Sequence, residues 1–379
     1  MFERNADQEL FEETTRRFIA SHCPLTRLRD LAGTKAGFEP DYWRQGAELG
    51  WTSLVVPEEA GGGSVSGSGV LDLVLVAYEF GLHAGPGPLG PTNVVAAALG
   101  RWGSDAQRSG PLAGLLSGEV IAAWALAEPA PNDRLGAIEL TARTDGDAIV
   151  LSGSKTPVEA GVEAHHLLVT ARHESGLSQL LVPADTPGVT VTSLQGLDMT
   201  RRFARVDFDE VRVPTSALVG RPHEATEAVD WLQDLAAVIQ LAETVGAMQW
   251  AFDTTLEWAF NRYSFGRPLA SYQEIKHRFA DLKMWLEASY AITAEAAQAV
   301  SDEAPNRAEL VSAAKFYVGR QGPELVQDCV QLHGGIGVTF DHDLHLFLRR
   351  VTTNVPTFGS PSEHAARLAA ILDTPEGQR

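Results

Sequence analysis

The spacing of apolar side chains divides the chain into three zones with different periods. In the first zone, residues 1–118, apolar residues recur at helical spacing over 8–22, 41–49, 70–82 and 94–99. Glycines and serines interrupt this pattern at 50–69, which predicts an exposed loop, and GPGPLGP at 85–91 is a second break. The first zone therefore predicts an N-terminal α-helical domain.

In the second zone, residues 119–220, the period changes to that of β-strands. Short β-branched and apolar runs, separated by Gly, Pro or Asp, follow one another: VIAAWALAEP, AIVLSG, HHLLVTAR, SQLLVPA, GVTVTSL and ARVDFDEVRVP. This pattern predicts a middle domain built as an antiparallel sheet or β-barrel.

The third zone, residues 221–379, returns to long helical patterns over 225–260, 272–301 and 307–334, followed by a terminal helix. Ser360 is placed as the N-cap of the terminal helix, with Pro361 at its first position and Glu363 completing a capping box. We expect a C-terminal four-helix bundle. The predicted fold class is thus α+β, with domains at 1–118, 119–220 and 221–379.

Composition and charge narrow the classes of partner. The 379 residues carry 30 basic and 49 acidic side chains, a formal net charge of −19, which argues against nucleic acid or an anionic membrane as the main partner. The two cysteines, far apart in sequence, predict neither a disulfide framework nor a cysteine metal site, so a cytoplasmic location is expected. The first 18 residues lack the apolar core of a signal peptide. The apolar stretch 235–252 contains a Glu, two Gln and a Thr, which favours a buried helix over a membrane span.

Glu243 is the only charged residue between Leu235 and Phe252. Its helical face is otherwise apolar or small, including Ala236 and Gly246, which leave room for a ligand or a neighbouring helix. Burial of a carboxyl group raises its pKa toward the range of a general base. The alternative interpretation is a structural glutamate paired with an arginine from elsewhere in the fold, and the residues alone leave both open.

Two other segments contain candidate binding groups. Gly334 and Gly335 follow a long helix, where they serve either as a C-cap or as a close approach to a cofactor phosphate. Arg262 and Arg267 flank a Phe-Gly pair and are candidate anion partners. Potential metal ligands occur at Asp341, His342, Asp343 and His345, but no helical H-x3-H or HExxH spacing is present, so we predict no metal site.

Four segments, taken together and in order, resemble the acyl-CoA dehydrogenase family over nearly the whole chain. They are LGWTSLVVPEEAGG, AWALAEP with IVLSGSK, RYSFGRPLASYQEIKHRFADL, and QLHGGIGVTFDHDLHLFLRR. The resemblance implies FAD as cofactor and oxidation of an acyl-CoA thioester to the α,β-enoyl product. In that reaction a base removes the α-proton while hydride from the β-carbon passes to the flavin.

The resemblance also implies cofactor-binding residues. On the adenine and pyrophosphate side these are Arg262, Phe265, Gln273, Gln331, Gly334 and Gly335. Leu126 and Glu128 of the middle domain, and a backbone turn containing Thr357 and Gly359, are implied to lie near the flavin. In this family the adenine-side groups typically reach the flavin of a neighbouring subunit, so a tetramer or another oligomer is implied.

The chain departs from the family pattern at the expected base. Phe358 stands where many members carry a catalytic Glu, and Ala236 occupies a second family location of that base. Glu243 resembles the Glu of an AAEQVGGA segment in bacterial members, which makes it the candidate base. The middle domain departs at residues 130–133 and at Thr156–Val158, where ring-side flavin contacts are usual.

Two functions follow from the resemblance. The first is an FAD-dependent acyl-CoA dehydrogenase of fatty acid or steroid side-chain β-oxidation, acting on an acyl-CoA or acyl-carrier thioester, with Glu243 as base and an electron-transfer protein as acceptor. The second is a non-catalytic or half-site subunit of a heteromeric dehydrogenase, lending adenine-side contacts to a FAD whose ring and base belong to its partner.

Overall fold

A computed structural model describes residues 3–129, 138–174 and 176–373 of the chain. The chain divides into two compact units, each assembled from non-contiguous segments. One unit comprises Met1–Arg27, Val74–Gly85 and Ala237–Arg379, and is helical apart from a small hairpin. The other comprises Leu28–Leu73 and Pro86–Ala236 and contains the main sheet. The predicted α+β class is confirmed, whereas the boundaries of a three-domain division remain a prediction.

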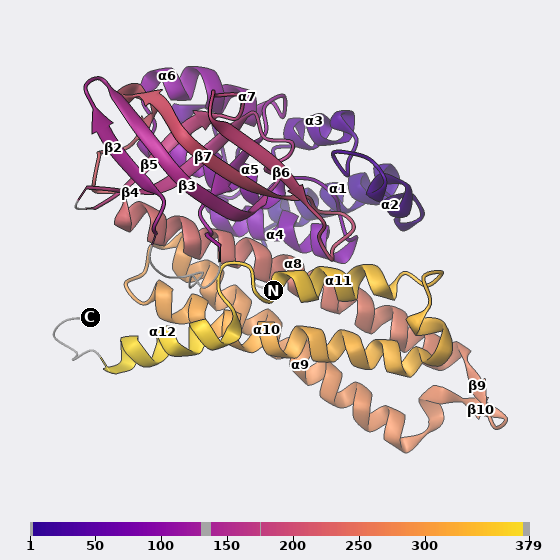
Figure 1. Cartoon of the computed structure of the whole chain (residues 1–379). Helices are drawn as coiled ribbons and strands as arrows, with labels where there is room; N and C mark the ends of the chain where they lie inside the picture. The colour runs from indigo at the N-terminus through magenta and orange to yellow at the C-terminus, as the bar shows by residue number, and fades with distance from the viewer. Residues whose placement is uncertain (1–2, 130–137, 175, 374–379) are drawn as a thin grey trace. The chain divides into compact units, whose positions relative to one another are not determined.

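The sheet unit contains eight strands in the described part of the chain (Figure 1). They are β1 (Ala122–Ala125), β2 (Thr141–Asp145), β3 (Ala148–Glu159), β4 (His166–His173), β5 (Gly176–Pro183), β6 (Val189–Leu194), β7 (Phe203–Pro214) and β8 (Leu218–Val219). Six of these fall on the apolar runs of the sequence. The short β2 and β8 were not predicted, because β2 has little apolar alternation and β8 only two residues.

The predicted middle β domain is confirmed and most of its strand pairs are antiparallel, but it differs from an antiparallel barrel in two respects. The strand order β6-β7-β3-β2-β4-β5-β8 is an open path, and no closed barrel is found among the described residues. Moreover, β4 pairs in parallel with β1 along His166–Val169 and with β2 at Arg172 and His173. Apolar periodicity reports which residues form strands, but neither strand direction nor closure, because both depend on pairing between distant segments.

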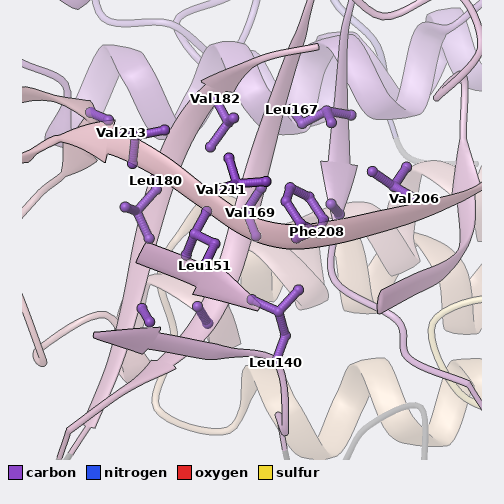
Figure 2. Close-up of a cluster of buried hydrophobic side chains, with 14 of the residues drawn as sticks. Leu140, Leu151, Leu167, Val169, Leu180, Val182, Val206, Phe208, Val211 and Val213 are labelled. Carbon is purple, nitrogen blue, oxygen red and sulfur yellow. The ribbon is translucent and has the colours of Figure 1, made fainter. Parts of the chain in front are cut away.

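One face of the sheet builds the core of this unit. Figure 2 shows the inward side chains, which include Leu151, Val169, Val206, Phe208 and Val211. Phe208 and Val211 are three residues apart, yet both point inward, because the register shifts where Leu151 pairs with Val211 and Gly153 with Phe208. Such a bulge inserts one extra residue and restores the inward face after it.

The helices of the sheet unit are shorter than the longest helices of the helical unit. They are α3 (Pro40–Glu48), α5 (Leu89–Trp102), α6 (Asp105–Gln107) and α7 (Ala113–Leu116), while α2 (Leu25–Ala32) and α4 (Gly69–Leu82) each belong partly to the helical unit. One loop prediction in the sheet unit also needs correction. Residues 50–69 contain only a short helical turn, Glu58–Ala60. However, Trp51 is fully buried against Tyr42 and Trp43, so the first half of this segment is not the exposed loop that was expected.

The helical unit is built around α10. Its long elements are α1 (Ala6–His22), α8 (Thr226–Asn261), α9 (Gln273–Ser301), α10 (Arg307–His333), α11 (Leu344–Asn354) and α12 (Pro361–Asp373). α10 packs against α9, α11 and α12, and a hairpin of β9 (Tyr263–Ser264) and β10 (Arg267–Pro268) joins α8 to α9. The observed bounds lie within a few residues of the helices expected at 225–260, 272–301 and 307–334, because long periodic segments are the clearest local signal.

Helix α8 is long and apolar enough to cross a membrane by length and composition. However, 89 % of its most apolar 18-residue window is buried within the protein. This burial agrees with the prediction of a buried core helix. Glu243 lies on this helix.

Candidate functional site

Glu243 lies on α8 where that helix contacts α4. A Cβ atom placed on Gly246 would lie 2.1 Å from the carbonyl oxygen of Tyr78, and one on Gly81 would lie 2.0 Å from the carbonyl oxygen of Glu243. These two glycines therefore allow the backbones of α4 and α8 to touch. Of the two uses that the sequence left open for the space at Gly246, the structure shows the neighbouring helix.

Glu243 is 3 % exposed, and its side chain faces an arginine from α11. Its Oε2 atom lies 3.9 Å from Nη1 of Arg350, which is 1 % exposed, and Arg350 Nη2 donates a hydrogen bond to the Gly85 carbonyl (3.0 Å). A buried ion pair of this kind is costly to break from one side, because the remaining charge is left without compensation. The arginine pairing that the structural interpretation requires is therefore present.

Lys315 of α10 joins α8 to the C-terminal segment. Its Nζ donates to Gln240 Oε1 (2.7 Å), to the Asn354 carbonyl (3.2 Å) and to the Thr357 carbonyl (2.7 Å). Asn354 Nδ2 in turn donates to Thr244 Oγ1 (2.9 Å). The turn of α8 that carries Glu243 is thus connected, through Lys315 and Asn354, to the turn at Thr357.

The turn at 357–360 has left-handed backbone at two residues, with φ of 55° at Phe358 and 96° at Gly359. The predicted capping box is confirmed: the Ser360 N–H donates to Glu363 Oε2 (2.6 Å) and the Glu363 N–H donates to Ser360 Oγ (3.3 Å). His364 Nε2 lies 2.9 Å from the Phe358 carbonyl oxygen. Burial lowers the pKa of His364 to about 4, so the ring is neutral at physiological pH.

Lys315, Arg350 and His364 were not singled out in the sequence. For Lys315 a signal exists, since it is the only charged residue from Leu310 to Val318, the same pattern that drew attention to Glu243. Arg350 and His364 lie among other charged residues, so the sequence alone does not distinguish them from surface side chains.

Arg262, Phe265 and Gln273 lie on or beside the hairpin between α8 and α9, and all three are exposed. Phe265 is 98 % exposed at the tip of the hairpin, with φ of 48°. The Arg262 guanidinium carbon is 5.7 Å from the centre of the Trp258 ring. His333, the last residue of α10, stacks on the same ring at 5.2 Å.

Gln331, Gly334 and Gly335 follow at the end of α10 and are also exposed. Gly334 has φ of 67°, a conformation that glycine adopts without steric cost. A Cβ on Gly334 or Gly335 would meet no described atom within 4 Å. The Trp258 ring therefore lies next to both Arg262, beside the hairpin, and His333, just before the turn at Gly334 and Gly335. Arg262 and the two glycines are exposed.

Leu126 and Glu128 belong to the other compact unit. The buried Lys155 donates to the Leu126 carbonyl (2.9 Å) and to Glu128 Oε1 (2.7 Å), while Glu128 also accepts the N–H groups of Glu139 and Leu140. Burial lowers the pKa of Lys155 to about 8. Burial alone would raise the pKa of Glu128, but Lys155 and the backbone donors outweigh it and hold this pKa below its ordinary value.

The middle domain departs from the family pattern at two segments, and the structure describes only the second. Residues 130–133 lie outside the described residues. At 156–158, Val158 is fully buried, and the Thr156 N–H donates to the Ala127 carbonyl (2.7 Å), so this segment is tied to the chain just after Leu126.

The two histidines among the potential metal ligands at 341–345 pack against aromatic rings. His342 packs edge-on against His333, and His345 stacks on Phe340. Elsewhere in the described residues, ligand atoms of His173, Glu174 and His223 gather within 4.8 Å. Both ring nitrogens of His173 lie within 2.9 Å of a hydroxyl, those of Thr144 and Ser178.

Comparison with known proteins agrees with this organisation. Models of the acyl-CoA dehydrogenase N-terminal, middle and C-terminal domains match residues 5–119, 123–211 and 234–370. The mitochondrial short-chain specific acyl-CoA dehydrogenase of Bos taurus is 30 % identical over 305 residues, which are 76 % of this chain and 72 % of the bovine protein. The chain belongs to the acyl-CoA dehydrogenase family.

Bacterial relatives match over greater length. Acyl-CoA dehydrogenase IpdE2 of Mycobacterium tuberculosis is 29 % identical over 363 residues, covering 96 % of each protein. A solved structure of the ChsE4-ChsE5 complex from Mycobacterium tuberculosis superimposes with a TM-score of 0.90 at 26 % identity, covering 99 % of this chain and 100 % of the matched one. The chain is an acyl-CoA dehydrogenase with the N-terminal helical, middle β and C-terminal helical organisation of that family.

Proposed function

We propose that the protein catalyses the FAD-dependent α,β-dehydrogenation of an acyl-CoA or acyl-carrier thioester, with Glu243 as the base. The observation that supports this role is the network from α8 to the C-terminal turn. Lys315 and Asn354 connect the turn of α8 that bears Glu243 to Thr357, and the next residue, Phe358, occupies the position at which many relatives carry the catalytic Glu. Glu243 is therefore a buried carboxyl group on the turn of α8 that hydrogen bonds of Lys315 and Asn354 connect to the turn at Thr357.

The residues proposed to bind the adenine side of FAD are exposed, so they suit a cofactor that lies against the surface of the chain. Arg262, Gln273 and Gln331 are exposed polar groups, and Gly334 and Gly335 offer backbone that no described side chain covers. Arginine and backbone N–H groups suit a pyrophosphate. We propose that these groups, with Phe265, hold the adenine side of a FAD shared with a neighbouring subunit, while Leu126, Glu128, Thr357 and Gly359 lie on its ring side.

When bound, FAD supplies the acceptor for the hydride that leaves the β-carbon. Glu243 takes up the α-proton. Arg350 Nη1 lies 3.9 Å from the Glu243 carboxylate and pairs with it. An electron-transfer protein would then reoxidise the cofactor, and we place the reaction in cytoplasmic β-oxidation of a fatty acid or a steroid side chain.

Replacement of Glu243 tests this role. Glu243→Gln should lower turnover by about 10²- to 10⁴-fold, the usual contribution of a general base, with FAD content retained. Because Gln leaves Arg350 without its charge partner, Glu243→Asp is measured beside it, since Asp keeps the charge but withdraws the carboxylate by one methylene. Glu257→Gln, exposed on the same helix, is the control and should leave turnover unchanged. Unchanged turnover in both Glu243 variants would remove Glu243 as the base.

A second candidate function is a subunit that supplies adenine-side contacts to a FAD whose ring and base belong to a partner chain. One specific observation favours it: Arg350 lies 3.9 Å from the Glu243 carboxylate, which is the arrangement of a structural ion pair. The similarity to a chain of the ChsE4-ChsE5 complex supports the same candidate. It predicts that the protein depends on a second acyl-CoA dehydrogenase-like subunit.

A further inference from the structure

Two consecutive carbonyl groups in the turn at 357–359 are each bound by a buried basic side chain. Lys315 Nζ donates to the Thr357 carbonyl at 2.7 Å, and His364 Nε2 contacts the Phe358 carbonyl at 2.9 Å. A carbonyl oxygen only accepts, so the proton of His364 resides on Nε2. The donors come from different elements: Lys315 lies on α10, and His364 on the first turn of α12.

Lys315 connects this turn to two other elements. Its remaining hydrogen bonds go to Gln240 on α8 and to the carbonyl of Asn354 at the end of α11. An ammonium group has three N–H donors, and these three acceptors match them. Lys315 is 3 % exposed, and burying a lysine is costly unless its N–H groups are hydrogen-bonded. The positions of the three acceptors are therefore coupled through this one side chain.

His364 contacts the next carbonyl group along the turn, that of Phe358. It is 1 % exposed, and its Nδ1 has no hydrogen-bond partner in the described part of the chain, so Nε2 makes its only polar contact there. The first residue of α12 is also fixed, because a Cβ on Gly319 of α10 would lie 2.9 Å from Pro361 Cγ. The close packing of α12 on α10 thus places His364 beneath the Phe358 carbonyl.

The turn needs such support because its backbone is unfavourable for one of its residues. Phe358 has φ of 55°, in the left-handed region that non-glycine residues rarely occupy. Strained conformations of this kind persist only when surrounding contacts determine them, and they gather at functional sites. The two hydrogen bonds act on the carbonyl groups immediately before and after the strained φ angle.

We propose that Lys315 and His364 are positioning residues that set the conformation of the turn 357–359 and thereby the placement of its backbone beside the flavin. This inference rests on the proposed function, in which Thr357 and Gly359 lie on the ring side of FAD. Phe358 stands where many family members carry a glutamate. The contacts of Lys315 and His364 that hold this turn are nevertheless present in the chain.

Hydrogen exchange measured on the full-length, FAD-loaded protein, with any partner subunit, tests the proposal. In His364→Leu and in Lys315→Met, amides of Phe358, Gly359 and Ser360 should exchange about tenfold faster, as expected for loss of one hydrogen bond, while α9 is unaffected. His364→Gln keeps an N–H donor and should restore exchange to near the original rate. Lys283→Met, an exposed lysine on α9, is the matched control and should change nothing.

The outcomes separate the positioning role from the proposed function. Unchanged exchange at 358–360 in both variants, or faster exchange throughout the helical unit, would overturn the positioning role. The flavin absorbance band is recorded on the same samples and should shift in His364→Leu but not in Lys283→Met. If exchange rises only at the turn while the flavin band stays unchanged, the positioning role stands and the placement of this turn beside the flavin is contradicted.

Discussion

Three buried ionisable side chains of the helical unit are held in different ways. Glu243 is paired with Arg350, Lys315 is surrounded by three oxygen acceptors, and His364 is neutral and contacts one carbonyl. Each arrangement avoids an isolated buried charge, which would cost on the order of several kcal/mol. These three residues contact α8, the end of α11 or the turn at 357–360, so they gather around one part of the helical unit.

His364 should make the protein sensitive to acid. Burial lowers its pKa in the folded state to about 4, whereas the ordinary value is 6.5. Between these values the unfolded chain binds a proton that the folded chain does not, so the free energy of unfolding falls as pH decreases from 6.5 toward 4. The loss is about 3 kcal/mol at its maximum.

Chemical denaturation of His364→Gln at several pH values measures this effect. The stability difference between the original protein and the variant should vary with pH only below 6.5, the ordinary pKa. His277→Gln, at an exposed position on α9, should track the original protein. A constant difference across this pH range would contradict the assignment to His364.

At the scale of elements, the contact between α4 and α8 decides what surrounds Glu243. Gly81 and Gly246 bring the two backbones together, and Arg350 from α11 binds the Gly85 carbonyl just after α4 ends. Phe347 of α11 stacks on Trp250 of α8 with ring centres 3.8 Å apart. Three elements distant in sequence thus enclose the same carboxyl group.

Gly246→Ala should destabilise the protein. Helix propensity alone favours Ala over Gly by about 0.5–1 kcal/mol, but a Cβ lying 2.1 Å from the Tyr78 carbonyl oxygen must force the helices apart. Overpacking costs typically about 1–3 kcal/mol and outweighs propensity. Gly110→Ala is the control, because a Cβ there meets no described atom within 4 Å. Thermal unfolding should show a lower Tm for Gly246→Ala only, and an equal or higher Tm would contradict the close contact.

At the scale of the whole molecule, the compact units do not follow the three zones of the sequence. The first zone contributes Met1–Arg27 and Val74–Gly85 to the helical unit, while Leu28–Leu73 belongs to the sheet unit. Within the helical unit, Arg16 of α1 binds the fully buried Glu79 of α4 at 2.7 Å, so N-terminal residues are tied to each other there.

The oligomeric state distinguishes the two candidate functions. Expressed alone, the chain should form an oligomer, show flavin absorbance and reduce an electron acceptor when given acyl-CoA, since the proposed adenine-side groups reach a neighbouring copy. Absorbance and size-exclusion chromatography measure the first two properties. A colourless chain that gains FAD only with a second acyl-CoA dehydrogenase-like subunit would contradict the self-sufficient enzyme and support the half-site subunit.

The sequence by itself determined the elements whose evidence is local. Helices such as α9 and α10 follow from apolar spacing, the start of α12 follows from Ser360 and Glu363, and six strands follow from β-branched runs. The order of family motifs identified the acyl-CoA dehydrogenase family, and the lone charge at Glu243 indicated a buried carboxyl group, because these signals need no knowledge of distant neighbours.

The tertiary structure decided what depends on contacts between distant segments. It placed Arg350 beside Glu243, filled the space at Gly246 with α4, and joined Lys315 and His364 to the turn at 357–359. It also replaced the expected barrel by an open mixed sheet in the described residues. Pairing partners, strand direction and helix contacts arise from long-range packing, which residue spacing along one chain does not encode.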